Sequence, residues 1–265
     1  MKKFFLMILT VAAMASCAPK GTAYTNPLDV KFGDPYVLLA SDGHYYMYGT
    51  GGVEDGFGCY RSDDLVNWEY LGAVYKGNTP DSWAESSFWA PEVYAYNGAY
   101  YMLATFTQDT KTMNQQGTVM LKAESPLGPF VPHSNGVVTP EEWECLDGTL
   151  YINREGKPYI VFCHEHTQII DGNISYVELS HDLKKSVGES RYLFSGSSPY
   201  YVKKKIPGDH YITDGPFMHR RENGDLYMLW STHLGAKYAQ CLVKFDENTI
   251  SGIFTHQKPI VTSDG

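Results

Sequence analysis

The chain has 265 residues, enough for one large all-β domain or two small domains. It carries 30 acidic against 21 basic side chains, a formal net charge of −9, which disfavours binding to nucleic acid or another polyanion. Tyrosine is unusually frequent, with 21 residues, and is typical of half-buried strands and of surfaces that stack against sugar rings. We therefore expect a neutral or weakly charged ligand.

The N-terminus is expected to be a processing segment. Residues 2–15 run from two lysines into an apolar stretch that is too short to span a bilayer. The next motif, Met14-Ala15-Ser16-Cys17, resembles a bacterial lipobox, which implies that Cys17 is lipidated. We expect residues 1–17 to be a lipoprotein signal peptide and residues 18–27 a tether. The protein would then be exported, periplasmic or at the cell surface, and would meet the membrane only through this anchor; an ordinary cleaved signal is the alternative.

The remaining cysteines lie singly along the chain, without CxxC spacing. Export permits disulfides, but the sequence assigns no pairing. We expect buried free thiols on strands at Cys59, Cys145, Cys163 and Cys241.

A carboxylate beside Gly or Pro, running into an apolar strand, occurs four times. The four residues are Asp34, Glu92, Asp147 and Asp214, at intervals of 58, 55 and 67 residues. Each is followed by a turn and then by an aromatic strand. A repeat of this kind, with several strands per unit, indicates a β-propeller.

Each unit is predicted to be an antiparallel sheet of short strands. No long stretch has the period of an amphipathic helix, so the fold class is all-β, with four four-stranded blades. The predicted strands are 34–39, 44–49, 58–62 and 68–75; 92–96, 99–106 and 118–123; 148–153, 158–163 and 174–179; 216–220, 226–231 and 239–245.

The first strand of a propeller blade lines the central channel, so the four carboxylates are expected to ring one mouth of it. The second strands run back and end at the same mouth. We therefore predict a pocket whose wall includes Trp89 and whose other lining residues are Asp34, Glu92, Asp147, Asp214, His164, Glu165 and His233.

Each of these residues also has a purely structural interpretation. An Asp before Pro or Gly often shapes a turn, and Trp89 could be a core residue. His164, Glu165 and His166 could bind a metal, but their spacing is not that of HExxH and neighbouring strand residues face opposite ways. We therefore expect no metal site.

Several carboxylates around an aromatic pocket suit the hydrolysis of glycosides. One carboxylate must be ionised to act as a base, and another must stay protonated to act as an acid. A third negative charge helps to keep that acid protonated, because like charges disfavour each other's ionisation. An inverting enzyme also needs room for a water molecule between acid and base.

The sequence over residues 28–265 resembles glycoside hydrolase family 43, whose members are five-bladed propeller enzymes. The matching segments are Asp34-Pro35-Tyr36-Val37, Ser62–Trp68, Trp89-Ala90-Pro91-Glu92-Val93, and Asp214-Gly215-Pro216 followed by Leu226–Ser231. The resemblance implies inverting hydrolysis of arabinofuranosides or xylosides in plant-type polysaccharides or oligosaccharides. It also implies that Asp34 is the general base and that Asp147 orients the acid and raises its pKa.

The sequence departs from the family at the acid and at its C-terminus. The family usually has Glu-Gly-Pro where this chain has Asp214-Gly215-Pro216, so Asp214 is the expected acid and Glu165 the alternative. The segment that usually opens the fifth blade is absent, so we expect a C-terminally truncated propeller. That segment carries a histidine that often helps to hold a structural Ca²⁺ in the channel. No cofactor is expected to be required.

Two hypotheses follow. The first is an exported inverting α-L-arabinofuranosidase or β-xylosidase, with substrate contacts at Trp89, Glu92, His164, Glu165 and His233. The second is a non-catalytic, surface-anchored glycan-binding propeller that has lost its acid. The identity of the sugar, and exo or endo action, stay open at this point.

Overall fold

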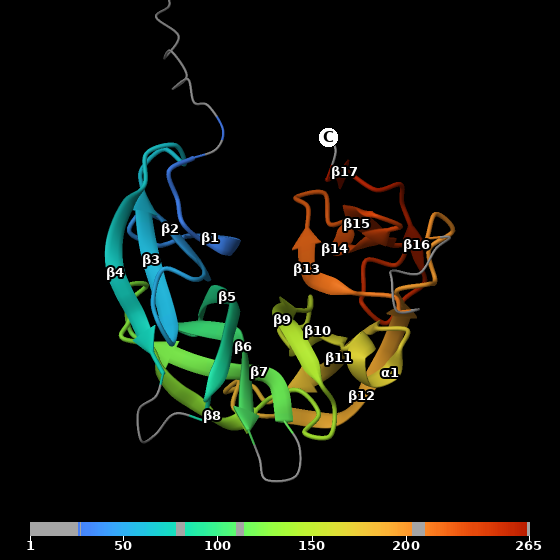
Figure 1. Cartoon of the computed structure of the whole chain (residues 1–265), viewed down its shortest axis with the longest axis horizontal. Helices are drawn as coiled ribbons and strands as arrows, with labels where there is room; N and C mark the ends of the chain where they lie inside the picture. Colours follow the sequence, from blue (N-terminus) through green and yellow to red (C-terminus); the bar gives the residue numbers. More distant parts are fainter. Residues whose placement is uncertain (1–25, 27, 78–82, 110–113, 203–209, 264–265) are drawn as a thin grey trace, which may run out of the picture.

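A computed structural model describes residues 26, 28–77, 83–109, 114–202 and 210–263. Four antiparallel sheets follow one another along the chain and stand as blades around a common centre (Figure 1). The all-β propeller prediction is therefore confirmed. The expected signal peptide with Cys17, and the tether apart from Asn26, lie outside the described residues.

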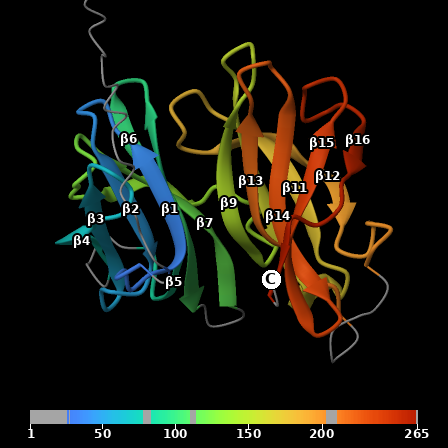
Figure 2. The same cartoon turned by 90° about the horizontal axis from the view of Figure 1, so that it is seen from above.

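Each blade runs from an inner strand at the centre to an outer strand at the rim. The turned view separates the first two blades from the last two (Figure 2). In the described chain the only helix is the short α1 (His166–Ile169). The strands are β1 (Gly33–Leu39), β2 (Tyr45–Thr50), β3 (Gly56–Ser62) and β4 (Glu69–Lys76); β5 (Ser86–Tyr96), β6 (Ala99–Asp109), β7 (Asn114–Ala123) and β8 (Val131–Val137); β9 (Cys145–Ile152), β10 (Pro158–His164), β11 (Asn173–Leu179) and β12 (Ser186–Ser195); and β13 (Asp214–Arg220), β14 (Leu226–Leu234), β15 (Lys237–Phe245), β16 (Phe254–His256) and β17 (Val261–Thr262).

The sequence did not predict the outer strands of the second and third blades, β8 and β12. Both lie at the rim, and most of their residues are exposed or half-buried. Such strands lack the strong apolar alternation from which a strand is recognised. In the fourth blade β15 pairs with two separate short strands, β16 and β17.

The hydrophobic core lies between neighbouring blades. One cluster joins the first and second blades around Phe57 and Phe106. A second joins the second and third blades around Leu103 and Phe162, and a third joins the last two around Trp230. All four cysteines in the described part of the chain are buried free thiols, as predicted. No helix among the described residues is long and apolar enough to cross a membrane.

The same β-bulge occurs near the start of every inner strand. In β1, Gly33 pairs with Thr50 and Tyr36 with Tyr48, so three steps on the inner strand oppose two on its partner. β5, β9 and β13 repeat this offset. In each blade the second residue of the bulge has a positive φ: Asp34 (47°), Ala90 (44°), Asp147 (54°) and Gly215 (50°).

The repeated bulge corrects the assumption that the four carboxylates are equivalent. Asp34 and Asp147 occupy the second position of the bulge. Asp214 occupies the first position and Glu92 the fourth, whereas Ala90 stands where a carboxylate was expected in the second blade. A bulge re-aims the side chains beside it, so these carboxylates meet the pocket from different directions.

Candidate active site

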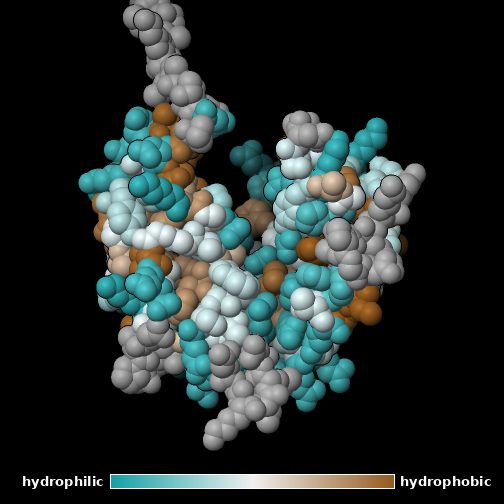
Figure 3. Space-filling model, viewed as in Figure 1, coloured by the Kyte–Doolittle hydropathy of each residue, from teal (hydrophilic) through white to brown (hydrophobic). Residues whose placement is uncertain are grey.

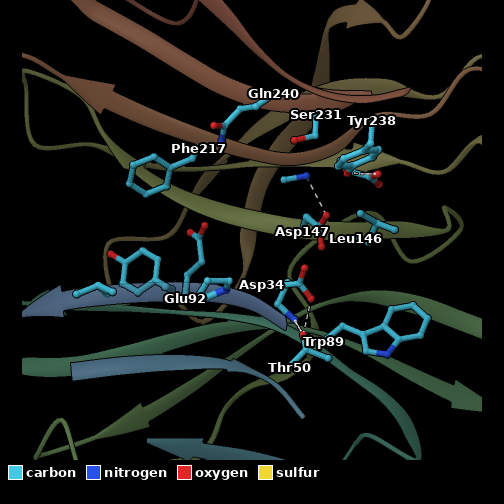
Figure 4. Close-up of a pocket in the computed structure, with 16 residues that line it drawn as sticks. Asp34, Thr50, Trp89, Glu92, Leu146, Asp147, Phe217, Ser231, Tyr238 and Gln240 are labelled. Atoms are coloured by element: carbon cyan, nitrogen blue, oxygen red, sulfur yellow. Dashed lines mark hydrogen bonds between the residues drawn. The ribbon is translucent and has the colours of Figure 1, made fainter. Parts of the chain in front are cut away.

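A pocket of about 830 Å³ lies where the inner strands converge. The space-filling view is deeply indented between the first and fourth blades (Figure 3). Five predicted residues line the pocket, together with backbone and side chains of all four blades (Figure 4). The lining residues are Asp34, Pro35, Tyr36, Val37, Thr50, Trp89, Ala90, Glu92, Leu146, Asp147, Asp214, Gly215, Phe217, Ser231, Tyr238 and Gln240.

Asp34 is held at the pocket by the end of the neighbouring strand. The hydroxyl of Thr50 donates a hydrogen bond to Asp34 Oδ2 at 2.7 Å. The same Thr50 oxygen accepts the backbone N–H of Ala90 at 2.8 Å. Thr50 therefore fixes Asp34 relative to the second blade, while the carboxylate itself remains open to solvent.

Asp147 is bound to both neighbouring blades. Its backbone N–H donates to the Thr105 hydroxyl at 2.9 Å, and its Oδ2 accepts the backbone N–H of Gly215 at 2.9 Å. Burial raises the pKa of Asp147 to about 7, and the nearby charge of Asp214 adds to the shift. The charge of Asp34 acts in the same direction. These three carboxylates are therefore electrostatically coupled.

The carboxylate of Asp214 accepts a hydrogen bond from a tyrosine. The Tyr238 hydroxyl donates to Asp214 Oδ2 at 2.7 Å. Burial raises the pKa of Asp214, and the charge of Asp34 also raises it, while the Tyr238 hydrogen bond and the charge of His233 act against the shift. The net direction favours the protonated acid.

Glu92 also lines the pocket and lies on the same side of it as Phe217 (Figure 4). The ring of Phe217 packs against that of Tyr36, with centroids 6.2 Å apart. The Tyr94 hydroxyl donates to Glu92 Oε2 at 2.5 Å and also contacts the Thr149 hydroxyl at 2.9 Å. Burial raises the pKa of Glu92 to about 8. This end of the pocket therefore offers aromatic rings and a carboxyl that stays protonated at neutral pH.

Trp89 is a wall of the pocket, because it lines the cavity and is 43% exposed. A tryptophan packed as plain core would be buried. Large aromatic faces open to a polar pocket suit stacking against an apolar face of a sugar ring.

His164, Glu165 and His233 are not among the residues that line the pocket. β9 and β10 stay paired beyond the bulge, and the Glu165 N–H donates to the Glu144 carbonyl. This continued pairing extends the end of β10 beyond the level of the pocket carboxylates. His164 stacks on Trp143 with ring centroids 4.3 Å apart. These contacts turn the end of β10 away from the cavity.

Glu165 and His233 still act on the site through charge. Glu165 is buried. Its pKa is raised to about 8, mainly by burial and in addition by the charges of Asp214 and Asp147. The ring of His233 packs against that of Tyr238 with centroids 5.1 Å apart. Tyr238 lines the pocket and His233 does not.

Sequence reasoning placed Thr50 at this mouth without giving it a role, and it missed Tyr238. Thr50 stands at the end of a second strand, where side chains were expected to reach the mouth. Tyr238 lies on β15 opposite His233, and only the register of the β14–β15 hairpin brings it beside Asp214. The short turn between Leu234 and Lys237 was the available signal.

The described residues contain no group of three or more His, Cys, Asp or Glu side chains that could hold a metal ion. The pocket carboxyls are instead hydrogen-bonded to hydroxyls and a backbone amide. As they stand, these pocket residues do not form a ready cation cage.

The comparisons with known proteins agree with this architecture. A solved structure of an endo-arabinase from Bacteroides thetaiotaomicron is 32% identical, with a TM-score of 0.81, and the match covers 91% of this chain and 85% of that one. The extracellular exo-α-(1→5)-L-arabinofuranosidase ArbA of Cellvibrio japonicus is 23% identical over 57% of this chain and 44% of its own length. A putative β-xylosidase of Xylanibacter ruminicola is 25% identical over 65% of this chain and 31% of its own length.

This chain therefore spans less than half the length of these two curated relatives. The family model for glycosyl hydrolases family 43 matches residues 24–264, a range that includes every strand of the described propeller. The four blades and the resemblance found in the sequence agree with that match. The chain belongs to glycosyl hydrolases family 43.

Proposed function

We propose that this protein is an inverting glycoside hydrolase that cleaves α-L-arabinofuranosyl linkages, with β-xylosyl linkages as the second substrate class. The observation that carries the proposal is the meeting of three carboxyls, Asp34, Asp147 and Asp214, in one pocket with aromatic walls. Their charges act on one another, which is the condition for separating an acid from a base.

Asp34 is the general base in this proposal. It is the most solvent-exposed of the three carboxyls, and the Thr50 hydroxyl holds one of its oxygens. Its other oxygen takes a proton from the water molecule that attacks the anomeric carbon. The attack occurs on the face opposite the leaving group, so the configuration at that carbon is inverted.

Asp214 is the general acid, and Asp147 keeps it protonated. Burial and the neighbouring carboxylates raise the pKa values of both groups, so the pair retains a proton near neutral pH. Asp147 also fixes the backbone beside the acid, because its Oδ2 accepts the Gly215 amide. Proton transfer to the glycosidic oxygen then accompanies bond cleavage.

The substrate class is supported by the named relatives. The Bacteroides endo-arabinase and the Cellvibrio arabinofuranosidase are named for the hydrolysis of arabinose linkages, and the Xylanibacter protein is named for the hydrolysis of xylosides. Trp89, together with Tyr36 and Phe217, offers stacking faces for the sugar rings. Such a substrate carries no charge, which also fits a chain with a net charge of −9.

We further propose that the protein is exported and anchored through a lipid at Cys17. Support comes from the lipobox-like sequence and from the relative described as extracellular. Mass spectrometry of the membrane fraction tests this, because a diacylglyceryl group on Cys17 adds a defined mass that Cys17→Ser would lack.

The activity is tested with aryl α-L-arabinofuranoside, aryl β-D-xyloside and α-1,5-linked arabino-oligosaccharides. We compare wild type with Asp34→Asn, Asp214→Asn and Glu165→Gln. The expected result is that Asp34→Asn loses turnover on every substrate and Glu165→Gln retains it. Asp214→Asn should lose the oligosaccharide but keep much of the aryl glycoside, since an activated leaving group needs little protonation.

The competing hypothesis of a glycan-binding propeller makes the opposite prediction. Wild type would bind arabino-oligosaccharides in calorimetry but would cleave none of the three substrates. That result would remove the hydrolase proposal and leave the pocket as a binding site.

A further inference from the structure

The acid carboxyl of this site is not free. Asp214 Oδ2 lies 2.7 Å from the hydroxyl of Tyr238, and both side chains line the pocket. Asp214 lies on β13 and Tyr238 on β15, so the contact spans β14, the strand between them. Tyr238 is 40% exposed and Asp214 is half-buried, so the phenol is the more open of the two groups.

Asp214 also has a short reach. Its side chain has a single methylene, one fewer than glutamate, which withdraws the carboxyl by roughly 1.5 Å, the length of one carbon–carbon bond. General-acid catalysis needs the donor within hydrogen-bond distance of the leaving oxygen, about 2.6–3.2 Å. A group placed between the carboxyl and the substrate would restore that distance.

We propose that Tyr238 is a catalytic residue that relays the proton of Asp214 to the glycosidic oxygen. This inference rests on the proposed hydrolase function and adds to it the residue that touches the leaving group. The phenol extends the acid, because its oxygen already lies at hydrogen-bond distance from Asp214 and at the pocket surface.

The relay conserves protons and charge. Before reaction Asp214 is protonated and donates to the Tyr238 oxygen, so the phenolic O–H is free to donate to the glycosidic oxygen. As the C–O bond breaks, the phenol gives its proton to the leaving oxygen and receives the proton of Asp214. Afterwards Asp214 is a carboxylate and Tyr238 donates to it, which is the arrangement in the structure.

The surroundings keep the phenol neutral between turnovers. Burial raises the pKa of Tyr238 above its ordinary range, and the negative charge of Asp214 raises it further once Asp214 has given up its proton. Tyr238 therefore keeps its proton near neutral pH. The ring of His233 packs against that of Tyr238 and fixes its orientation.

The test measures how kcat/KM depends on the leaving group. We use a series of aryl α-L-arabinofuranosides whose phenols differ in acidity, together with arabino-oligosaccharides. The proteins are wild type, Tyr238→Phe, Asp214→Asn and the control Tyr192→Phe, which removes an exposed hydroxyl from the rim strand β12.

The relay predicts that Tyr238→Phe loses about 10²–10³-fold in kcat/KM on oligosaccharides and under tenfold on the most activated aryl glycoside. Its dependence on leaving-group acidity should become as steep as that of Asp214→Asn. A phenylalanine variant with the wild-type slope, even at reduced rate, would mean that Tyr238 only supports the fold, and would overturn the proposal.

A double variant tests the reason for the relay. In Asp214→Glu, Tyr238→Phe the longer carboxyl should reach the substrate directly and recover at least tenfold of the activity lost in Tyr238→Phe. No recovery would contradict the argument from reach. If wild type itself cleaves neither class of substrate, the hydrolase proposal fails, and the relay fails with it. If wild type is active and Tyr238→Phe keeps the wild-type dependence on leaving-group acidity, only the relay is overturned.

Discussion

The backbone N–H of Gly215 donates a hydrogen bond to Asp147 Oδ2 at 2.9 Å, joining the third and fourth blades at the pocket. The equivalent amides in the preceding blades have different partners: Ala90 N–H donates to the Thr50 hydroxyl, and Asp147 N–H donates to the Thr105 hydroxyl. In the third blade the matching strand position is Cys163, which pairs with Leu146. A thiol is a weak acceptor, so the Gly215 amide is left to the carboxylate.

Cys163→Ser tests this relationship. The serine hydroxyl would compete with Asp147 for the Gly215 amide, so we expect kcat to fall about tenfold, equivalent to about 1.4 kcal/mol. Cys163→Ala is the matched control, because it removes the thiol without adding an acceptor. Steady-state kinetics decide the point: equal kcat values for the serine and alanine variants would show that the amide is not contested.

Gly215→Ala should be tolerated, although Gly215 has a φ of 50°. Ala90 adopts a φ of 44° at the same position of the second blade, and no heavy atom beyond the two chain neighbours lies within 4 Å of the place where a Cβ would stand on Gly215. We expect a stability loss of about 1 kcal/mol from the left-handed backbone and kcat within threefold of wild type. Thermal melting with kinetics checks both values, and a large loss of kcat would show that the pocket cannot accept the methyl group.

Thr50→Val should damage the site more than its position suggests. It removes the donor to Asp34 Oδ2 and the acceptor of the Ala90 amide together. The Ala90 amide is half-buried, so leaving it without a partner should cost about 1 kcal/mol, the low end of the range for buried amides, and a misplaced base should lower kcat by about 10²-fold. Thr50→Ser keeps the hydroxyl and should retain both stability and activity; a serine variant as impaired as the valine variant would show that the hydroxyl alone does not hold Asp34 in place.

Asp147→Asn should move the alkaline limb of the kcat profile to lower pH. The charges of Asp147 and Asp214 are coupled, and coupling of this kind acts on both partners. Loss of the Asp147 charge lowers the pKa of Asp214, so the acid deprotonates earlier, by about one pH unit. Asn can still accept the Gly215 amide. Glu155→Gln, an exposed carboxylate on the turn between β9 and β10, serves as control, and an unshifted limb in Asp147→Asn would remove its role in tuning the acid.

Glu92 should make the fold less stable as pH rises. Burial raises its pKa from an ordinary 4.5 to about 8, so the folded protein holds this proton over a range in which the unfolded chain has lost it. Its stabilising contribution is therefore complete below about pH 4.5 and is lost as pH rises through 8. Glu92→Gln keeps the acceptor for Tyr94 and has no charge to bury.

We expect Glu92→Gln and wild type to unfold at similar denaturant concentrations at pH 5, with the variant more stable by about 3 kcal/mol at pH 8.5. Asp147 and Glu165 contribute in the same pH range, so the difference between variant and wild type is the quantity to measure. A difference that does not change with pH would mean that Glu92 is ionised in the folded protein.

The sequence predicted the blades well because each repeat ends in a turn and begins with an apolar strand. It could not show that the carboxylates stand at different positions of a bulge. Asp34 and Asp214 look equivalent in spacing, yet the pairing of Gly33 with Thr50 and of Asp214 with Ser231 sets them one residue apart. The intervals between the four carboxylates differ by several residues, so an offset of one residue within the bulge cannot be read from them.

The remaining differences come from contacts distant in sequence. Tyr238 reaches Asp214 because β15 folds back beside β14, which depends on the length of one turn. His164 leaves the pocket because it stacks on Trp143, a residue of the preceding loop. Neither contact follows from strand pattern alone.

The most direct test of the account is proton NMR of the sugar first released from an α-1,5-linked arabino-oligosaccharide by wild type and by Asp34→Asn. We expect that wild type first releases the β-anomer and that Asp34→Asn releases no sugar at a detectable rate. Release of the α-anomer first would contradict inversion, and cleavage by Asp34→Asn at the wild-type rate would contradict the role of the pocket carboxylates.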